Sequence, residues 1–133
     1  MKPRAENWRG LVQTIADNAQ AGDVVIALSS EINPALRYYT RDRKTFPNVV
    51  LVPGAFPYRS PGRHYIGNLG APKIEPSDRL LVRAALKNHK RVWLVSRAQF
   101  LYDPEDIVMK EIGAARKLMH VYQKDIITVA LFE

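Results

Sequence analysis

Two serines and an asparagine follow the first strongly apolar stretch of the chain. Residues 24–28 are Val-Val-Ile-Ala-Leu, Ser29 and Ser30 come directly after them, and Asn33 follows shortly. At the carboxyl end of a strand in an open α/β sheet, such side chains lie beside a helix N-terminus, where anionic groups bind. Helix capping by Asn33 and loop hydroxyl groups that satisfy backbone amides are a simpler explanation. We therefore predict a strand-to-helix connection that is also the best-placed ligand crevice.

A second group of candidate binding residues lies in residues 54–76, a segment rich in glycine and proline. Arg59, Arg63 and His64 stand among tyrosines there, and a guanidinium group binds phosphate through paired hydrogen bonds. Tyrosine packing that fixes the loop would explain the same residues. We expect Arg59, Arg63 and His64 to line an exposed surface that attracts anions, because residues 54–74 contain no acid and a buried arginine would need one.

The motifs that mark common catalytic and cofactor sites are missing from the sequence. The chain has no cysteine, and its three histidines show no pair at the spacing of metal ligands. Neither the glycine pattern of dinucleotide-binding folds nor a P-loop occurs. The acids of residues 103–106 could be paired carboxylates, but helix initiation explains them better. We predict no metal and no cofactor, and we assign no catalytic residue.

The charge balance favours an anionic partner. Lysine and arginine outnumber aspartate and glutamate by 20 to 13, and between Arg37 and Arg97 thirteen basic residues face only three acids. Such an excess attracts phosphates or acidic lipid headgroups, although a basic surface can also serve solubility alone. A nucleic-acid-binding module would need its arginines on one contiguous face. We do not expect nucleic acid as a partner, because the chain carries no recognised nucleic-acid motif.

The length of the chain predicts one domain. With 133 residues, of which 47% are hydrophobic, the chain can bury a core without disulfides or metals. No apolar stretch approaches the roughly 20 residues that span a bilayer, and the N-terminal residues lack the apolar core of a signal peptide. We expect residues 1–133 to form a single α/β domain that is soluble as given.

Apolar periodicity predicts helices and strands in alternation. The expected helices cover residues 5–20, 34–40, 77–88 and 103–123, and the expected strands lie near 23–28, 48–53, 91–96 and 125–132. Strands separated by helices pair in parallel through right-handed crossovers. We therefore predict a three-layer, Rossmann-like sandwich with a small, mostly parallel four-stranded sheet and the first strand at its centre. The direction of the last strand is left open, because an edge strand could run antiparallel.

Several segments resemble a known family of membrane enzymes. They are NWRGLVQTIADNAQAGDVVIA, PALRYYT, RVWLVSRAQ and the final ITVALFE. Together they are similar to the C-terminal soluble domain of membrane glycosyltransferases of the dolichyl-phosphate-mannose–protein mannosyltransferase superfamily. The resemblance covers nearly the whole chain.

The resemblance implies that this chain is a piece of a larger, multi-spanning membrane protein. That parent would transfer a sugar from a polyprenyl-phosphate carrier, and this domain would lie on its extracytoplasmic (periplasmic) side. No residue here matches the catalytic acids of the family, which implies a non-catalytic accessory domain. Its implied partners are the membrane core of the parent and anionic lipid headgroups or the lipid-linked sugar phosphate. The alternative is a stand-alone, Rossmann-like small-molecule-binding protein or enzyme, which would need a deep crevice lined by Ser29, Ser30 and residues 96–102.

Overall fold

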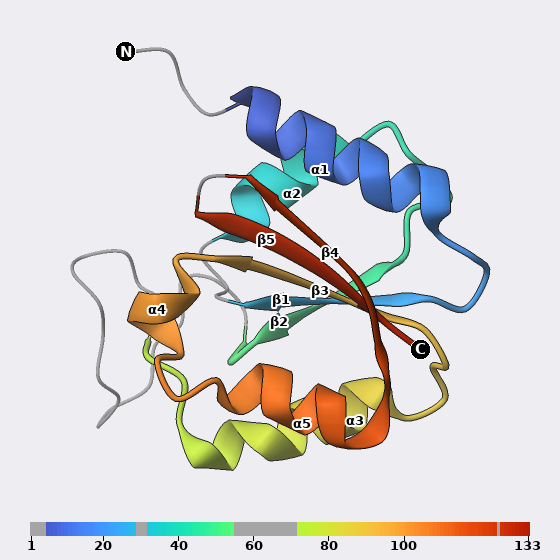
Figure 1. The fold of residues 1–133 in the computed structure, drawn as a ribbon. Helices are drawn as coiled ribbons and strands as arrows, with labels where there is room; N and C mark the ends of the chain where they lie inside the picture. The colour runs from blue at the N-terminus through green and yellow to red at the C-terminus, as the bar shows by residue number, and fades with distance from the viewer. Residues whose placement is uncertain (1–4, 29–31, 55–71, 125) are drawn as a thin grey trace.

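The chain folds into three layers, with helices on both faces of one sheet (Figure 1). The computed structural model describes residues 5–28, 32–54, 72–124 and 126–133. Helices α1 and α2 cover one face of the sheet, and α3 and α5 cover the other. The elements in chain order are α1 (Ala5–Asn18), β1 (Val24–Leu28), α2 (Asn33–Thr40), β2 (Asn48–Val52), the 3₁₀ helix η2 (Pro76–Asp78), α3 (Arg79–Leu86), β3 (Val92–Arg97), α4 (Gln99–Tyr102), α5 (Ile107–Ala115), β4 (Leu118–Lys124) and β5 (Ile127–Phe132).

The sheet has five strands in the order β2-β1-β3-β5-β4, and their directions are mixed. Strand β1 pairs in parallel with β2 and β3, whereas β5 pairs antiparallel with both β3 and β4. The α/β class is as predicted, but the prediction of a Rossmann-like, mostly parallel sheet of four strands is wrong. We predicted β1 at the centre of the sheet. Strand β1 is interior, but β3 occupies the central position.

The error lies in the residues after Ala115, which we predicted to continue a helix to about Gln123. Helix α5 ends at Ala115, and Arg116 has an extended backbone with φ −139° and ψ 151°. Met119 and Tyr122, which the predicted helix 103–123 would contain, lie instead in strand β4. Valine and tyrosine in this stretch favour strands, and the helical spacing of the apolar residues is coincidental.

The extra strand also explains the direction of β5. Lys124 pairs with Ile127, so the chain reverses through a two-residue connection and β5 must run antiparallel to β4. Because β5 is also antiparallel to β3, β3 and β4 point in the same direction with β5 between them. The predicted crossover after β3 therefore exists, but it leads to β4 instead of to the last strand.

Strand β1 contributes to two separate cores, because successive side chains of a strand point to opposite faces. All five of its residues are buried. Val24, Ile26 and Leu28 pack in the core that includes Val108 and Ile112 of α5. On the other face, the core beneath α1 and α2 contains Val25, Ala27, Trp8, Ile15, Leu36 and Trp93.

Candidate functional site

The predicted crevice at the end of β1 lies where the strand order of the sheet reverses. From β1 the chain passes to β2 on one side, whereas β3 lies on the other side, with Ser96 opposite Leu28. Ligands of open α/β sheets bind at the carboxyl ends of strands at such a point. Ser29 and Ser30 lie outside the described residues, so the crevice itself stays a prediction.

Of Ser29, Ser30 and Asn33, only Asn33 lies among the described residues. It is the first residue of α2 and half-buried. The capping role predicted for it is not observed, because Ile32 occupies the N-cap position and forms no side-chain cap hydrogen bond. Pro34 does stand in the first turn of the helix, as predicted.

Residues 96–102 would have to line the deep crevice that the alternative, a stand-alone enzyme or small-molecule-binding protein, requires. Ser96, Ala98 and Tyr102 are buried, whereas Phe100 and Leu101 are 62% and 45% exposed. Ala98 has a left-handed backbone with φ 55° and starts the short helix α4. This segment therefore turns sharply away from the end of β3.

The other predicted site residues cannot be placed. Arg59, Arg63 and His64 lie outside the described residues, as does most of the glycine- and proline-rich segment. Their role in binding anions stays a prediction from the sequence.

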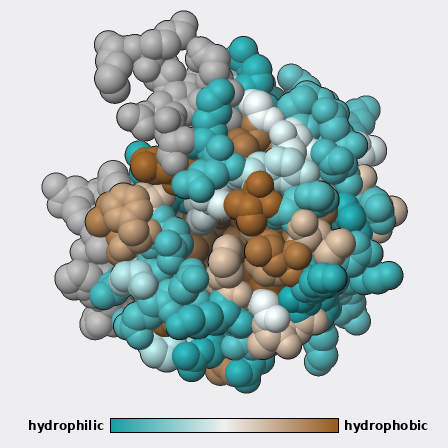
Figure 2. Space-filling model, viewed as in Figure 1, coloured by the Kyte–Doolittle hydropathy of each residue, from teal (hydrophilic) through white to brown (hydrophobic). Residues whose placement is uncertain are grey.

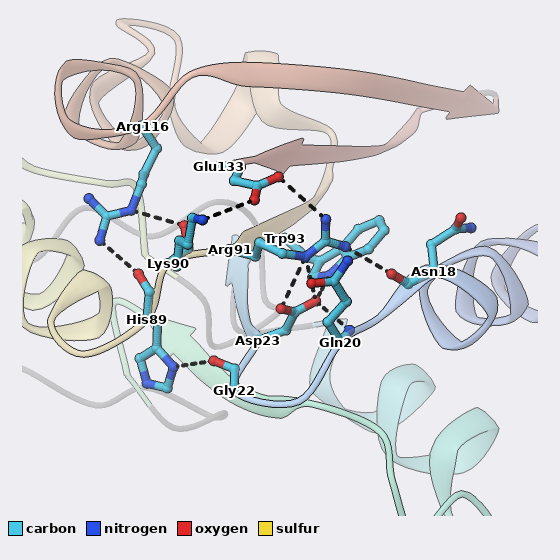
Figure 3. Close-up of polar contacts among 10 residues, drawn as sticks. All are labelled: Asn18, Gln20, Gly22, Asp23, His89, Lys90, Arg91, Trp93, Arg116 and Glu133. Carbon is cyan, nitrogen blue, oxygen red and sulfur yellow. Dashed lines mark hydrogen bonds and ion pairs between the residues drawn. The ribbon is translucent and has the colours of Figure 1, made fainter.

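A buried polar network lies at the opposite end of the sheet, where β1 and β3 begin (Figure 3). Asp23 precedes β1, and its side chain is 2% exposed. The Nε of Arg91 lies 3.2 and 3.3 Å from the two carboxylate oxygens of Asp23. The Nε1 of Trp93 and the backbone N–H of Gln20 donate to Oδ2 of the same carboxylate, at 2.9 and 3.0 Å. Every oxygen of this acid therefore has a donor.

Arg91 extends the network to α1 and to the last residue of the chain. Its Nη2 donates to the Asn18 carbonyl at 2.8 Å, and its Nη1 lies 3.6 Å from Oε1 of Glu133. The Nζ of Lys90 lies 3.7 Å from Oε2 of the same glutamate. One arginine thereby joins α1, β1, β3 and the end of β5.

Further hydrogen bonds hold the loop between α3 and β3 beside this network (Figure 3). The Nη2 of Arg116 donates to the carbonyls of Leu86 and His89 at 3.1 and 2.7 Å. The Nδ1 of His89 lies 2.7 Å from the carbonyl oxygen of Gly22. Because a carbonyl oxygen only accepts, Nδ1 carries a proton and Nε2 is left for another partner. Gly22 has φ 90°, a conformation that glycine adopts without strain.

Two open hollows flank the network. The larger has a volume of about 440 Å³ and is lined by the end of α1, by residues 44–48 and by His89. The smaller, of about 210 Å³, is lined by residues that include Arg91, His120, Tyr122 and Glu133. Both could hold a small polar molecule, but the acid between them is already bound by Arg91 and Trp93. The network around Asp23 therefore stabilises the fold, and the hollows beside it have room for a ligand. Asp23 itself is not available for acid–base catalysis.

A second buried acid supports the start of α5. Asp103 is 1% exposed, and its two oxygens accept the backbone N–H groups of Ile107 and Val108 at 2.8 and 2.9 Å. Burial raises the pKa of the Asp103 carboxyl above its ordinary value, the two amides act against this, and the charges of Asp106 and Glu105 add to the rise. The prediction that the acids of residues 103–106 initiate a helix is confirmed for Asp103, although the helix begins at Ile107.

The sequence analysis missed the Asp23–Arg91 network. A signal was present, because an acid directly precedes one buried strand and an arginine directly precedes another. When two such strands pair in parallel, these residues lie at the same edge of the sheet.

Within the described residues, no group of three or more histidines and acids could hold a metal ion. None of the helices there has both the length and the hydrophobicity that crossing a bilayer requires. No protein-family model, no curated protein and no solved structure matches this chain. Membership of the mannosyltransferase superfamily therefore stays a prediction from the segments quoted above.

Proposed function

We propose that the chain is a non-catalytic accessory domain of a polyprenyl-phosphate-sugar-dependent membrane glycosyltransferase. It would help that enzyme to recognise its acceptor or its anionic lipid carrier from the extracytoplasmic side. One observation carries the proposal: three of the four segments that resemble this family meet in a single polar network, and the fourth packs in the hydrophobic core beneath it.

Each of the resembling segments contributes to that network or to the core beneath it. Asp23 belongs to GDVV, Arg91 and Trp93 to RVWLV, and Glu133 ends ITVALFE; their side chains are linked around Arg91 (Figure 3). Trp8 of NWRG shares a hydrophobic core with Trp93. The residues by which the chain resembles the family thus lie together in the fold, which is what the proposal requires of them.

The same network supports a structural role for these residues. The Asp23 carboxylate accepts hydrogen bonds from Arg91, Trp93 and Gln20, so it is not free to act as a nucleophile or a base. Asp23, Arg91 and Trp93, which belong to the resembling segments, therefore stabilise the fold of the domain. Sugar transfer would need reactive groups from the membrane core of the parent.

The first test separates an accessory domain from a stand-alone enzyme. Purified alone, the chain should neither transfer nor hydrolyse sugar from a nucleotide-sugar or polyprenyl-phosphate donor. The product of the whole open reading frame should sediment with membranes and transfer labelled sugar from a polyprenyl-phosphate donor, and deleting residues 1–133 should reduce that transfer severalfold.

Two results would contradict the proposal. One is a whole product that stays out of the membrane fraction. The other is turnover by the isolated chain that Ser30→Ala or His64→Ala abolishes, which would establish the stand-alone enzyme instead.

The second test concerns the proposed anionic partner. The chain should bind vesicles that contain acidic lipid at low salt and lose most of that binding at physiological ionic strength, because charges are screened beyond about 8 Å there. Replacing Arg59 and Arg63 with serine should weaken the binding and leave the melting temperature nearly unchanged. Vesicle co-sedimentation and thermal unfolding measure the two effects.

A matched control removes two charges elsewhere. Lys87 and Lys110 are exposed at α3 and α5, and Lys87→Ser with Lys110→Ser should weaken vesicle binding less. Equal weakening would show that total charge, and not the loop, attracts the vesicles. Unfolding by the Arg59 and Arg63 replacements would show that the loop is structural.

A further inference from the structure

Strand β4 forms one end of the sheet, and no described strand pairs with its outer edge. Its side chains are largely exposed, and three of them are apolar: Leu118, Met119 and Val121 are 45%, 43% and 51% exposed. Figure 2 shows hydrophobic side chains gathered in the middle of the face that β4 and β5 present in this view. The helices on either side of the sheet leave this edge uncovered.

Most of β4 lacks the features that protect the edge strands of natural sheets. Such strands usually carry charges, prolines or bulges that prevent pairing with another chain. A register shift between Leu118 and His120 interrupts only the first part of β4. From Leu118 to Gln123 the strand has no proline and no lysine, arginine, aspartate or glutamate. Among the described residues, the edge is therefore open to a further strand.

We propose that β4 pairs antiparallel with β4 of a second copy of this chain, about a two-fold axis at Val121. This axis pairs all seven residues of the strand and places Val121 against itself, as a symmetric interface requires. His120 then faces Tyr122 and Leu118 faces Lys124. The inference rests on β4 alone and does not depend on the proposed function.

Strand length and charge together favour this register, because an axis nearer the C-terminus pairs fewer residues of β4 and an axis nearer the N-terminus opposes like charges. Moving the axis half a residue toward the N-terminus sets Lys124 opposite Lys117, and moving it by one residue sets Lys124 opposite Arg116. Like charges directly opposite each other destabilise a strand pair. With the axis at Val121, each Lys124 lies opposite an apolar residue, and no like charges meet within β4.

The two copies contribute apolar and aromatic cross-strand pairs. The rings of His120 and Tyr122 lie 6.1 Å apart in one chain, and pairing would bring the same two rings of the second copy opposite them. Valine and aromatic residues pair favourably across antiparallel strands. A single strand pair buries less than a standard interface, so we expect a reversible dimer with a micromolar dissociation constant.

Sedimentation equilibrium of the wild-type chain should therefore fit a monomer–dimer equilibrium. Val121→Lys should raise the dissociation constant about tenfold or more, because two ammonium groups would meet at the axis. The control is Leu80→Lys, the same kind of change at a residue of α3 that is 67% exposed, and it should leave the dimer intact.

A mixture of two variants tests the axis directly. Val121→Lys and Val121→Glu should each be monomeric, and an equimolar mixture should form a heterodimer, because opposite charges then meet at the position that faces itself. The mixture also shows that both variants are folded. A monomeric wild-type chain, a dimer that Val121→Lys leaves intact, or a mixture that stays monomeric would overturn the proposal.

Discussion

Asp23→Ala should destabilise the protein by about 3–5 kcal/mol, the loss expected when one partner of a buried ion pair is removed. The variant would leave the Arg91 guanidinium, 11% exposed, without its buried acid and with only the partly exposed Glu133 beside it. The indole N–H of Trp93 and the backbone N–H of Gln20 would lose their acceptor as well. Since domains of this size are stable by about 5–15 kcal/mol, urea unfolding should show a marginally stable protein.

Asp23→Asn separates the charge from the hydrogen bonds. Asparagine keeps one oxygen that can accept from Trp93, so this variant should lose less stability than Asp23→Ala. A partly exposed ion pair serves as the control: the Nε of Arg83 lies 2.7 Å from Oε2 of Glu111, and their side chains are 60% and 15% exposed. Breaking that pair with Arg83→Ala should change the unfolding midpoint far less, because water screens exposed pairs.

A double variant identifies the source of the loss. If the uncompensated charge of Arg91 dominates, Asp23→Ala with Arg91→Met should be more stable than the sum of the two single losses predicts. Losses of stability that simply add in the double variant would contradict the role assigned to the network. A loss of stability from Asp23→Ala no larger than that from Arg83→Ala would contradict it as well.

The three parallel strands could be predicted from the sequence because each leaves a local signal, although β2 at the edge of the sheet is only partly buried. Residues 24–28, 48–52 and 92–95 are continuous apolar runs apart from Asn48, and such runs mark strands that helices cover on both sides. The strands end within a residue or two of the predicted bounds. Their parallel direction followed from the crossover rules, but the order of the strands was not predicted beyond an interior position for β1.

Strand β4 could not be predicted in the same way, because its signal is not local. Apolar residues at 112, 115, 119 and 122 fit helical spacing, and no glycine or asparagine marks the reversal between Lys124 and Ile127. The strand is stabilised by pairing with β5, a tertiary contact that periodicity does not reveal. One missed turn therefore changed both the strand count and the direction of the last strand.

The polar network of the candidate site could not be predicted from the sequence either, because it also depends on tertiary contacts. Composition drew attention to Ser29, Ser30 and the arginines of the central loop, whereas the polar network observed lies at the other end of the strands. Asp23 and Arg91 are 68 residues apart, and only the pairing of β1 with β3 brings them together. Spacing along the chain does not carry that information.

Asp103→Ala should cost about 2–3 kcal/mol, from the loss of a helix-capping acceptor and from two amides left without a partner. The Ile107 and Val108 amides that it binds are buried, so water replaces the carboxylate poorly. The control is Glu105→Ala, an exposed acid of the same turn, which should leave the urea midpoint nearly unchanged. A loss from Asp103→Ala as small as that of the control would exclude the capping role.

The pH dependence of Asp103→Asn tests the direction of the pKa shift. Because burial raises the native pKa of Asp103 above its ordinary value of 3.8, the native state keeps the proton at pH values where the unfolded chain has released it. The group therefore stabilises the fold most below that ordinary value, and its contribution falls as the pH rises to the native pKa. Asparagine does not titrate. The free energy of unfolding of the wild type should therefore exceed that of Asp103→Asn most below pH 3.8, and the difference should decrease as the pH rises to the native pKa. Urea unfolding at several pH values measures this difference. A difference that widens would mean that the hydrogen bonds from Ile107 and Val108 outweigh burial and lower the pKa instead.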